Sequence, residues 1–413
     1  MGWATEHPLL FFQLSTMMFL QFAIWGAWAP VLAARLVGPL GFSGKQTGWV
    51  YSTLPLACIV TPLVAGPLAD RFIPADILLG IAHLLGAVLM FVAARQTKFW
   101  PLFWSMLGFS ACYAATLPLV NSVMFAQLGQ TFATQEEVGS ASAGIFLWAP
   151  IAWAVSGYIL TAWRQVIGEN DGRDCMNLAA VMAAIMGIAC FFIVPLTPPA
   201  AVDAPILQAF FQGFTLLGDL NFAVFLTISL VLAGLMQFYF LGTAPFMQGM
   251  GVSSKYVPGA MALAQVAQAV ATVVLMGFLM REIGHRATLV VGAFAWLLLY
   301  QAYVFGKPRT LIVVAQPLHG IAYVLFIIVG QIYGNALAPE GMVASVQALV
   351  FAATTGLGLF LFTLAAGAVM DRFSVEGKFQ WEKVWTVAAV LTANCVVALI
   401  LWIIAISDSL GAP

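Results

Sequence analysis

The stretch LLFFQLSTMMFLQFAIWGAWAPVLAARL, residues 9–36, decides the fold class of this chain of 413 residues. It carries a single charged side chain, Arg35, close to its end, and it exceeds the roughly 20 apolar residues that cross a bilayer as a helix. It is too long for the core of a cleavable signal peptide, and no basic region precedes it. We therefore interpret this stretch as a transmembrane helix.

Similar apolar stretches recur along the whole chain. Apolar residues make up 62% of the sequence and charged residues 8%, against about 45–50% and 25% in soluble domains. Twelve stretches of this kind lie near 9–36, 47–69, 75–97, 99–127, 139–163, 177–197, 220–248, 254–281, 286–306, 309–337, 341–370 and 383–407. The sequence predicts an all-α, multi-pass protein of the cell inner membrane, with the lipid bilayer around it.

The widest gap between spans separates six spans from six. It predicts an N-terminal six-helix bundle over 1–197, a linker over 198–219 and a C-terminal six-helix bundle over 220–413. The linker starts with two prolines and continues into an apolar run. An interfacial amphipathic helix and an irregular loop both fit that pattern.

A weak repeat supports this division into halves. The string GPLADR at 66–71 follows the second span, and GFLMREIGHR at 277–286 follows the eighth. We expect Gly66, Asp70 and Arg71 to form a gating motif, in which glycine lets helices approach and the charged pair caps helix ends. A similar string, GAVMDR at 367–372, shows that the pattern also arises elsewhere in the sequence.

Several functional classes are excluded by what the sequence lacks. The net charge of −1 offers no basic surface for nucleic acid. No nucleotide-binding loop, metal-ligand spacing or nucleophile beside a base is present, so we expect no enzyme activity, cofactor or metal. The five cysteines include no CxxC pair; four lie in apolar spans, and we place Cys175 in a loop without a disulfide partner.

Charged side chains lie in the gaps or at the ends of the spans. Near the span centres only His83 and His319 could titrate. Because ionisable groups at mid-membrane usually mark ion or proton paths, this distribution argues against a proton relay.

Six short strings together carry a resemblance to a known family. They are FLQFAIWGAW at 19–28, GWVYST at 48–53, AGPLADR at 65–71, YAATLPLVNS at 113–122, LHGIAY at 318–323 and ASVQ at 344–347. In these strings the chain resembles the nucleoside:proton symporters of the major facilitator superfamily, nearly end to end. The resemblance implies two six-helix bundles, a nucleoside-like solute, alternating access and both termini in the cytoplasm.

The chain departs from the family's pattern where that pattern carries charge. The pattern Arg-x-Trp-Gly-Thr-x-Gly in span five is replaced by FLWAPIA at 146–152, and Gln-x-x-Glu in span eight becomes Gln265 to Gln268. The acidic residue of span ten is matched by Val324, and an arginine before span eleven by Val343. Each change removes a charge, so we expect transport without proton coupling.

Polar and aromatic side chains at helical spacing supply candidate substrate-binding residues. Amides and a histidine among aromatic rings suit a flat, neutral, polar solute. The set is Gln21, Trp25, Asn121, Phe146, Trp153, Gln237, Phe240, Gln265, Gln268, His319 and Tyr323. The structural alternative is that the amides join helices to one another through hydrogen bonds.

The loop charges disagree with the family's orientation. Twelve Lys and Arg follow odd-numbered spans and three follow even-numbered ones, Arg71, Arg281 and Arg286. The positive-inside rule would place both termini outside the cytoplasm; we predict the family's orientation. The sequence thus predicts a monomeric carrier of a small neutral solute. A proton symporter using His319 and a non-transporting receptor derived from a carrier are the alternatives.

Overall fold

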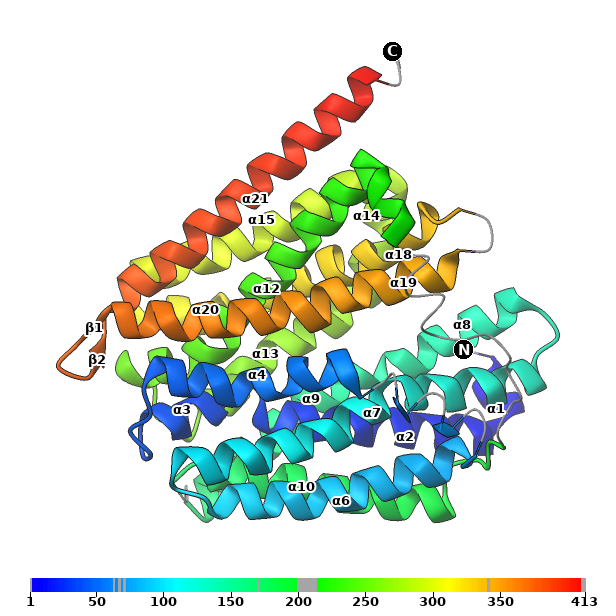
Figure 1. Ribbon diagram of the computed structural model, residues 1–413, viewed down its shortest axis with the longest axis horizontal. Coiled ribbons are helices and arrows are strands. Elements are labelled where there is room, and N and C mark those ends of the chain that lie inside the picture. The colour runs from blue at the N-terminus through cyan, green and yellow to red at the C-terminus, as the bar shows by residue number, and fades with distance from the viewer. Residues whose placement is uncertain are drawn as a thin grey trace. The chain divides into compact units, whose positions relative to one another are not determined.

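The computed structural model describes residues 2–61, 64–65, 68–69, 72–168, 171–198, 214–339 and 342–409 (Figure 1). The chain divides into two compact units, 1–41 with 56–203 and 42–55 with 204–413. The described part of each unit is helical, apart from one hairpin of two short strands in the second unit.

The first unit is built on long helices. Its elements are α1 (Trp3–Glu6), α2 (Pro8–Trp28), α3 (Leu32–Val37), the end of α4 (Gly44–Val60), α6 (Ala75–Arg95), α7 (Phe99–Thr131), α8 (Gln135–Phe146), α9 (Trp148–Val166) and α10 (Arg173–Phe192). Helix α10 packs against α6 and α2, α6 packs against α7, and α2 packs against α9. These helices contain few polar residues, and most of them show no clear division into a polar and an apolar face. They are therefore held together by packing on several sides.

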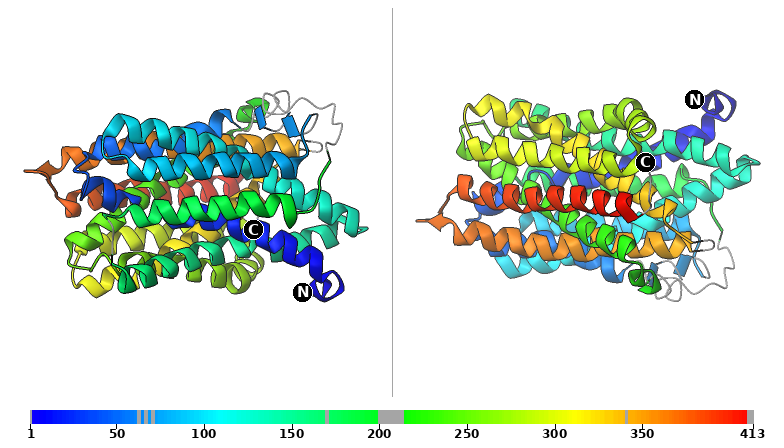
Figure 2. Two further views of the ribbon diagram at one scale, coloured as in Figure 1. Left: turned by 90° about the horizontal axis from the view of Figure 1, so that it is seen from below. Right: turned by 90° about the horizontal axis from the view of Figure 1, so that it is seen from above.

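The second unit contains more short and irregular segments. They are η1 (Phe214–Gly218), α12 (Leu220–Gly249), α13 (Val257–Val270), η2 (Ala271–Leu275), α14 (Met276–Glu282), α15 (Gly284–Phe305), α16 (Arg309–Val314), α17 (Gln316–Ala322), η3 (Tyr323–Ile328), α18 (Val329–Ala336), α19 (Val343–Phe351), η4 (Ala352–Gly358), α20 (Leu359–Arg372), β1 (Ser374–Val375), β2 (Lys378–Phe379) and α21 (Trp381–Ser409). The segments η2, η3 and η4 are π-helical turns inside longer helices. Figure 2 shows the hairpin β1–β2 projecting from the ends of α20 and α21.

The helices confirm the predicted all-α membrane architecture. Within the described ranges, 11 helices are long and apolar enough to cross a membrane, and each coincides with a predicted span. The remaining prediction, 47–69, coincides with α4, which has 17 residues and leads into a partly undescribed segment. The predicted spans therefore agree with the helices to within a few residues at most ends.

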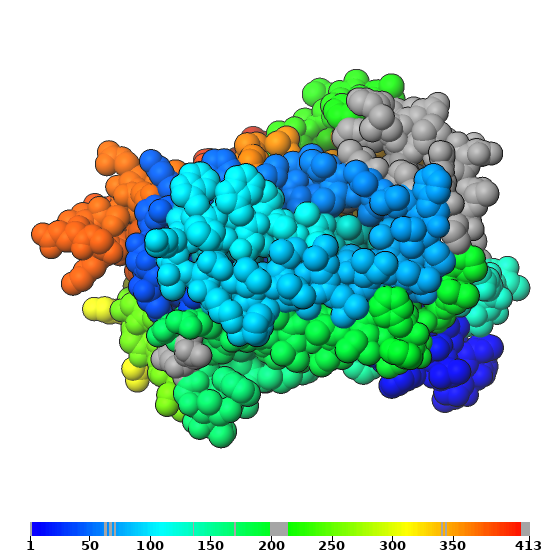
Figure 3. Space-filling view, turned by 60° about the horizontal axis from the view of Figure 1, so that its bottom comes forward, coloured from blue at the N-terminus to red at the C-terminus, as the bar shows by residue number. Residues whose placement is uncertain are grey.

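Apolar side chains cover the outer surface of the first unit. On α6, Ile81, Leu85 and Val88 are 49%, 52% and 60% exposed, at the three- and four-residue spacing of one helix face. The space-filling view shows this face, blue to cyan over α6 and α7 (Figure 3). An exposed apolar stripe of this kind is stable only against lipid or protein, as expected of a membrane helix.

Buried charged residues of the first unit gather at helix ends. Arg164, near the end of α9, binds both carboxylate oxygens of Asp174 in α10, with N–O distances of 2.5 and 2.8 Å. Arg35 of α3 donates to the backbone carbonyls of Asp171 (2.8 Å), Ala94 and Gln96 (3.2 Å each). Burying a guanidinium is tolerable only with such partners.

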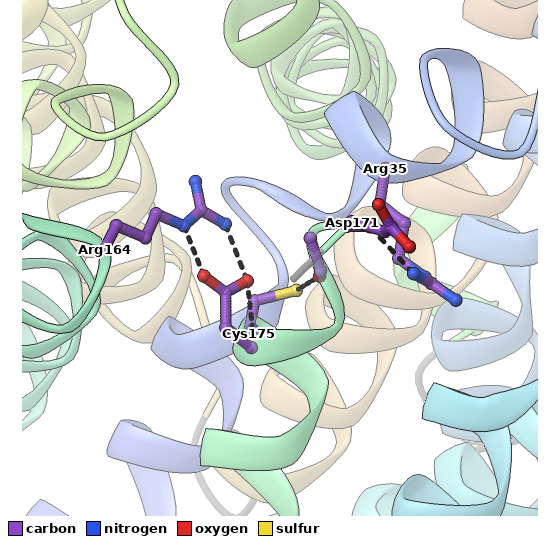
Figure 4. Close-up of polar contacts among 6 residues, drawn as sticks. Arg35, Arg164, Asp171 and Cys175 are labelled. Carbon is purple, nitrogen blue, oxygen red and sulfur yellow. Dashed lines mark hydrogen bonds and ion pairs between the residues drawn. The ribbon is translucent and has the colours of Figure 1, made fainter. Parts of the chain in front are cut away.

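The first turn of α10 corrects the prediction for Cys175. The residue lies in this helix, fully buried, and its thiol contacts the Gly172 carbonyl oxygen at 3.1 Å (Figure 4). The predicted span begins at residue 177, so Cys175 falls in the loop before it. The helix instead begins at Arg173, and Asp174 in its first turn pairs with Arg164.

Glycine permits close packing of α4 against α20 in the second unit. A Cβ added to Gly367 would lie 2.3 Å from the Gly44 carbonyl oxygen, and one added to Gly48 would lie 2.9 Å from the Thr363 carbonyl oxygen. The Asp371 carboxylate accepts hydrogen bonds from the backbone N–H groups of Gly44 (2.5 Å) and Lys45 (2.9 Å). The string at 367–372 therefore joins two helices and caps one of them.

Two predicted features fall on undescribed residues. The gating motif of Gly66, Asp70 and Arg71 lies outside the described ranges. Most of the predicted linker, 199–213, does so as well; its end forms the turn η1, and Asp219 then caps α12 through the Phe222 N–H at 3.0 Å.

Candidate functional site

Two glutamines of α13 are buried amides without partners. Gln265 and Gln268 lie one helical turn apart and are 8% and 9% exposed. Neither side chain makes a hydrogen bond to any described residue; the bonds of these residues are backbone bonds, such as the one that the Gln268 carbonyl oxygen accepts from the Thr272 hydroxyl at 2.9 Å. These two side chains can therefore bind a polar solute without giving up an existing bond.

Helix α17 crosses α13 at very short range beside these amides. A Cβ built on Gly320 would lie 1.8 Å from the Ala264 carbonyl oxygen and 2.7 Å from the Gln268 nitrogen. Only glycine allows this approach of the two backbones. The crossing brings the helix that carries His319 against the helix that carries the two amides.

His319 is held among three aromatic side chains. Its ring stacks on Tyr239 with centroids 3.8 Å apart and planes 7° from parallel, and it meets Phe240 edge-on at 5.7 Å. The indole N–H of Trp296 donates to His319 Nδ1 at 3.2 Å. Helices α12, α15 and α17 thus fix the imidazole from three directions.

Tyr323 and Val324 begin the π-helical turn η3. Tyr323 is half-buried, and its hydroxyl has no hydrogen-bond partner within the described ranges. Val324 is fully buried and packs with Ala271 and Leu325 in an apolar cluster. A π turn shifts the side chains that follow it around the helix axis and is frequent at functional sites.

Gln237 joins two helices. Its amide nitrogen donates to the Thr363 hydroxyl of α20 at 2.5 Å, and that hydroxyl donates to the Leu359 carbonyl oxygen at 2.6 Å. Phe240, one turn further along α12, contacts the rings of Tyr239 and His319. Of these two predicted residues, Phe240 belongs to the His319 surroundings, whereas Gln237 is bonded between α12 and α20.

Gln21 of the first unit has a partner for both its amide nitrogen and its amide oxygen. It is fully buried; its amide nitrogen donates to Thr116 Oγ1 at 2.8 Å, and its amide oxygen lies 2.7 Å from His83 Nε2. The Tyr113 hydroxyl also donates to the Gln21 backbone oxygen at 2.7 Å. This network joins α2, α6 and α7, which is the helix-joining alternative for Gln21.

Of the other predicted residues of the first unit, Trp25 adjoins the Gln21 network, because its ring meets that of Tyr113 with centroids 6.1 Å apart. Trp25 and Trp153 are half-buried, with ring centroids 5.5 Å apart. Asn121 is exposed, and Phe146 is 38% exposed and contacts Phe125.

The predicted shared face of Phe146 and Trp153 is interrupted. Helix α8 ends at Phe146 and α9 begins at Trp148. Pro150 explains the break, since proline has no N–H to donate to the carbonyl oxygen of Phe146. The two aromatic residues therefore lie on separate helices.

Sequence reasoning missed Trp296 and Tyr239. Both are buried and contact the His319 ring, and the Tyr239 hydroxyl donates to Gln316 Oε1 at 2.8 Å. The available signal was that a tryptophan or tyrosine in an apolar span needs a partner for its N–H or O–H. Helix periodicity alone does not identify that partner.

Comparisons with known proteins agree on one family. Residues 9–407 match the sequence profile described as Nucleoside H+ symporter. YegT of Escherichia coli (strain K12), provisionally named a nucleoside transporter, is 29% identical over 398 residues, covering 92% of this chain and 91% of its own. The xanthosine permease of the same organism is 25% identical over 393 residues, covering 91% and 92%.

The fold is also that of a solved transporter. The crystal structure of the nucleoside transporter NupG superposes with a TM-score of 0.83 at 23% sequence identity, covering 95% of this chain and 99% of that one. The predicted major facilitator fold is thereby confirmed.

Proposed function

This chain belongs to the nucleoside H+ symporter family, and we propose that it carries a neutral nucleoside across the cell inner membrane by alternating access, without proton coupling. Family membership and the membrane helices make the chain a multi-pass transport protein rather than an enzyme. The nature of its solute and the absence of coupling are the proposal.

The pair of partnerless amides on α13 is the observation that carries the proposal. A nucleobase presents hydrogen-bond donors and acceptors along one edge, and an amide offers both kinds of group. Gln265 and Gln268 stand one turn apart on one helix, buried and without other bonds among the described residues. A solute can pair with them without displacing a hydrogen bond to another described residue.

The other candidate residues favour a neutral, flat solute. None of them carries a formal charge, so no charge on the solute needs to be neutralised. Aromatic rings such as Tyr323 and Phe240 offer faces and edges for stacking. This composition favours a nucleoside over a phosphorylated or acidic solute.

The lack of acidic residues supports transport without proton coupling. Symport requires a group whose protonation changes with solute binding. Where the family resemblance implies acids, this chain has Gln268 and Val324, and Val324 is packed in an apolar cluster. His319, the alternative proton carrier, has its Nδ1 occupied by the Trp296 N–H.

The test is uptake into proteoliposomes that contain the purified protein. We expect uptake of one or more nucleosides from a panel that also holds nucleobases, sugars and neutral amino acids. Replacing Gln265 or Gln268 by Ala should weaken the apparent affinity about two- to tenfold, the value of one lost hydrogen bond. The matched control is Gln301→Ala. Gln301 is exposed on α15, so its replacement should leave the apparent affinity for nucleoside unchanged.

Two outcomes would contradict the proposal. Uptake restricted to sugars or amino acids would assign the protein a different solute. Nucleoside affinity equal in the wild type and both glutamine variants would make these amides helix-joining residues.

A further inference from the structure

We infer that Trp296 is a positioning residue that fixes His319 as a neutral imidazole with its proton on Nε2, so that His319 offers the solute an N–H donor only. The inference rests on the proposed function for its solute class, and it deepens that function. A site of this kind selects solutes that present an acceptor, such as a carbonyl oxygen or an unprotonated ring nitrogen.

The tautomer follows from the direction of the Trp296 hydrogen bond. An indole nitrogen can only donate, so the His319 Nδ1 that receives it at 3.2 Å must carry a lone pair. A neutral imidazole has one N–H, which must then be on Nε2. Nδ1 cannot take up a proton while Trp296 donates to it.

The orientation of the ring is fixed by its neighbours. Tyr239 stacks on one face of His319 at 3.8 Å, and the Tyr239 hydroxyl is itself held by Gln316. Gln316 in turn donates to the Tyr303 hydroxyl at 2.5 Å and to the Ile312 carbonyl oxygen at 2.8 Å. Turning the imidazole over about its Cβ–Cγ bond would keep the stack but would place Cδ2 in front of the Trp296 N–H and break that bond. The stack therefore fixes the plane of the ring, and the Trp296 bond fixes which edge faces the indole.

The Nε2 side of His319 is left for a ligand. No described residue accepts a hydrogen bond from His319 Nε2, although the side chain is 1% exposed. An N–H that has no acceptor in the described part of the protein can donate to an acceptor on a solute. The neighbouring α13 contributes the two amides that also lack partners.

Charged groups near the ring do not favour an imidazolium. Helices α12, α13 and α17 and the turn η3 contain no Asp, Glu, Lys or Arg, and α15 has Arg286 and the titratable His285 only in its first turn. The other titratable groups on these elements are tyrosines: Tyr239, Tyr300, Tyr303 and Tyr323. These five elements therefore supply no carboxylate that could stabilise a charged His319.

His83 of the first unit provides an internal comparison. Its Nε2 lies 2.7 Å from the Gln21 amide oxygen, whose nitrogen is engaged by Thr116. His83 therefore also carries its proton on Nε2, but that proton is used in a helix-joining bond. The two buried histidines share a tautomer, and only His319 has its donor free for a solute.

The first measurement is nitrogen NMR of the full-length protein labelled with ¹⁵N at histidine, with the His319 signals assigned by their loss in His319→Gln. We expect the Nε2–H tautomer in the wild type and a mixture of tautomers in Trp296→Phe, while the His83 signals stay unchanged. An Nδ1–H tautomer in the wild type would overturn the inference, and this result does not depend on the variant folding or on any solute.

The second measurement is competition of uptake by adenosine, 3-deazaadenosine and 7-deazaadenosine, each analogue lacking one ring-nitrogen acceptor. We expect the wild type to discriminate against one analogue by about five- to tenfold. Discrimination should fall below about twofold in Trp296→Phe and in His319→Leu. The variant His319→Gln keeps an N–H donor and should retain the discrimination. Discrimination retained in His319→Leu would overturn the role of His319 as donor. If no nucleoside is carried, the proposed function fails, and the tautomer result still decides the role of Trp296.

Discussion

Buried glutamines differ in their hydrogen bonding in this molecule. Both amide atoms of Gln21 are bonded, to His83 and Thr116, whereas the side chains of Gln265 and Gln268 have no partner among the described residues. The sequence identified all of these glutamines as candidates because they interrupt apolar spans. It could not separate them, since their partners lie on other helices far away in the chain.

Replacing Gln21 by Leu should lower the stability of the protein without changing its solute preference. The substitution leaves the His83 N–H buried and unpaired, at a cost of about 1–3 kcal/mol. We expect a lower melting temperature in detergent, measured beside Gln265→Leu, which should melt at or above the wild-type temperature. The double variant Gln21→Leu with His83→Leu should recover part of the loss, because both partners are then apolar. A Gln21→Leu variant as stable as the wild type would contradict the network.

At the scale of helices, backbone contacts need glycine at defined positions. Gly320 in α17 tolerates no side chain, because its Cβ would meet the Ala264 carbonyl oxygen at 1.8 Å. Gly320→Ala should therefore lower the free energy of unfolding by about 1–3 kcal/mol or more. The higher helix propensity of alanine is too small to offset this loss. Thermal unfolding in detergent measures the loss.

The matched control for this prediction is Gly330→Ala in α18. A Cβ there would have its nearest neighbour, Leu289, at 3.8 Å, which is an ordinary contact. We expect this variant to melt within a few degrees of the wild type. Equal melting of the two alanine variants would show that α13 and α17 can separate at no cost.

Helices were easier to predict than the breaks within them. The spans can be predicted from composition, because a long apolar segment in a bilayer has to satisfy its backbone hydrogen bonds internally, as a helix does. The break at Leu147 and the π turns at Tyr323 and Ala352 depend on local geometry that hydropathy does not record. Cys175 was placed wrongly for a similar reason, since hydropathy does not mark the start of α10 at Arg173.

For the whole molecule, the central prediction is equilibration without accumulation. Proteoliposomes with an inward proton gradient should fill with nucleoside to the outside concentration and no further, since no acidic residue lies at a span centre. Labelled uptake with and without the gradient measures this. Accumulation that collapses with a protonophore would contradict it, and loss of that accumulation in His319→Gln would make His319 the coupling residue.

The orientation in the membrane is the second prediction at this scale. We expect both termini in the cytoplasm, although twelve of the 15 Lys and Arg residues would lie on the opposite side. A reporter active only in the cytoplasm, fused after Pro413, should be active. A well-inserted fusion without reporter activity would show that the loop charges set the orientation. The predicted division into 1–197, 198–219 and 220–413, and a monomeric state, likewise stay predictions.

The contact of Gly320 with Ala264 bears on how solute is recognised during transport. Close backbone contact opposes independent sliding of two helices, so we expect the amides on α13 and the imidazole on α17 to keep one spacing whichever way the carrier opens. A nucleoside arriving from either side of the membrane then meets the same set of hydrogen-bonding groups. Import and export should therefore rank a series of nucleosides in the same order.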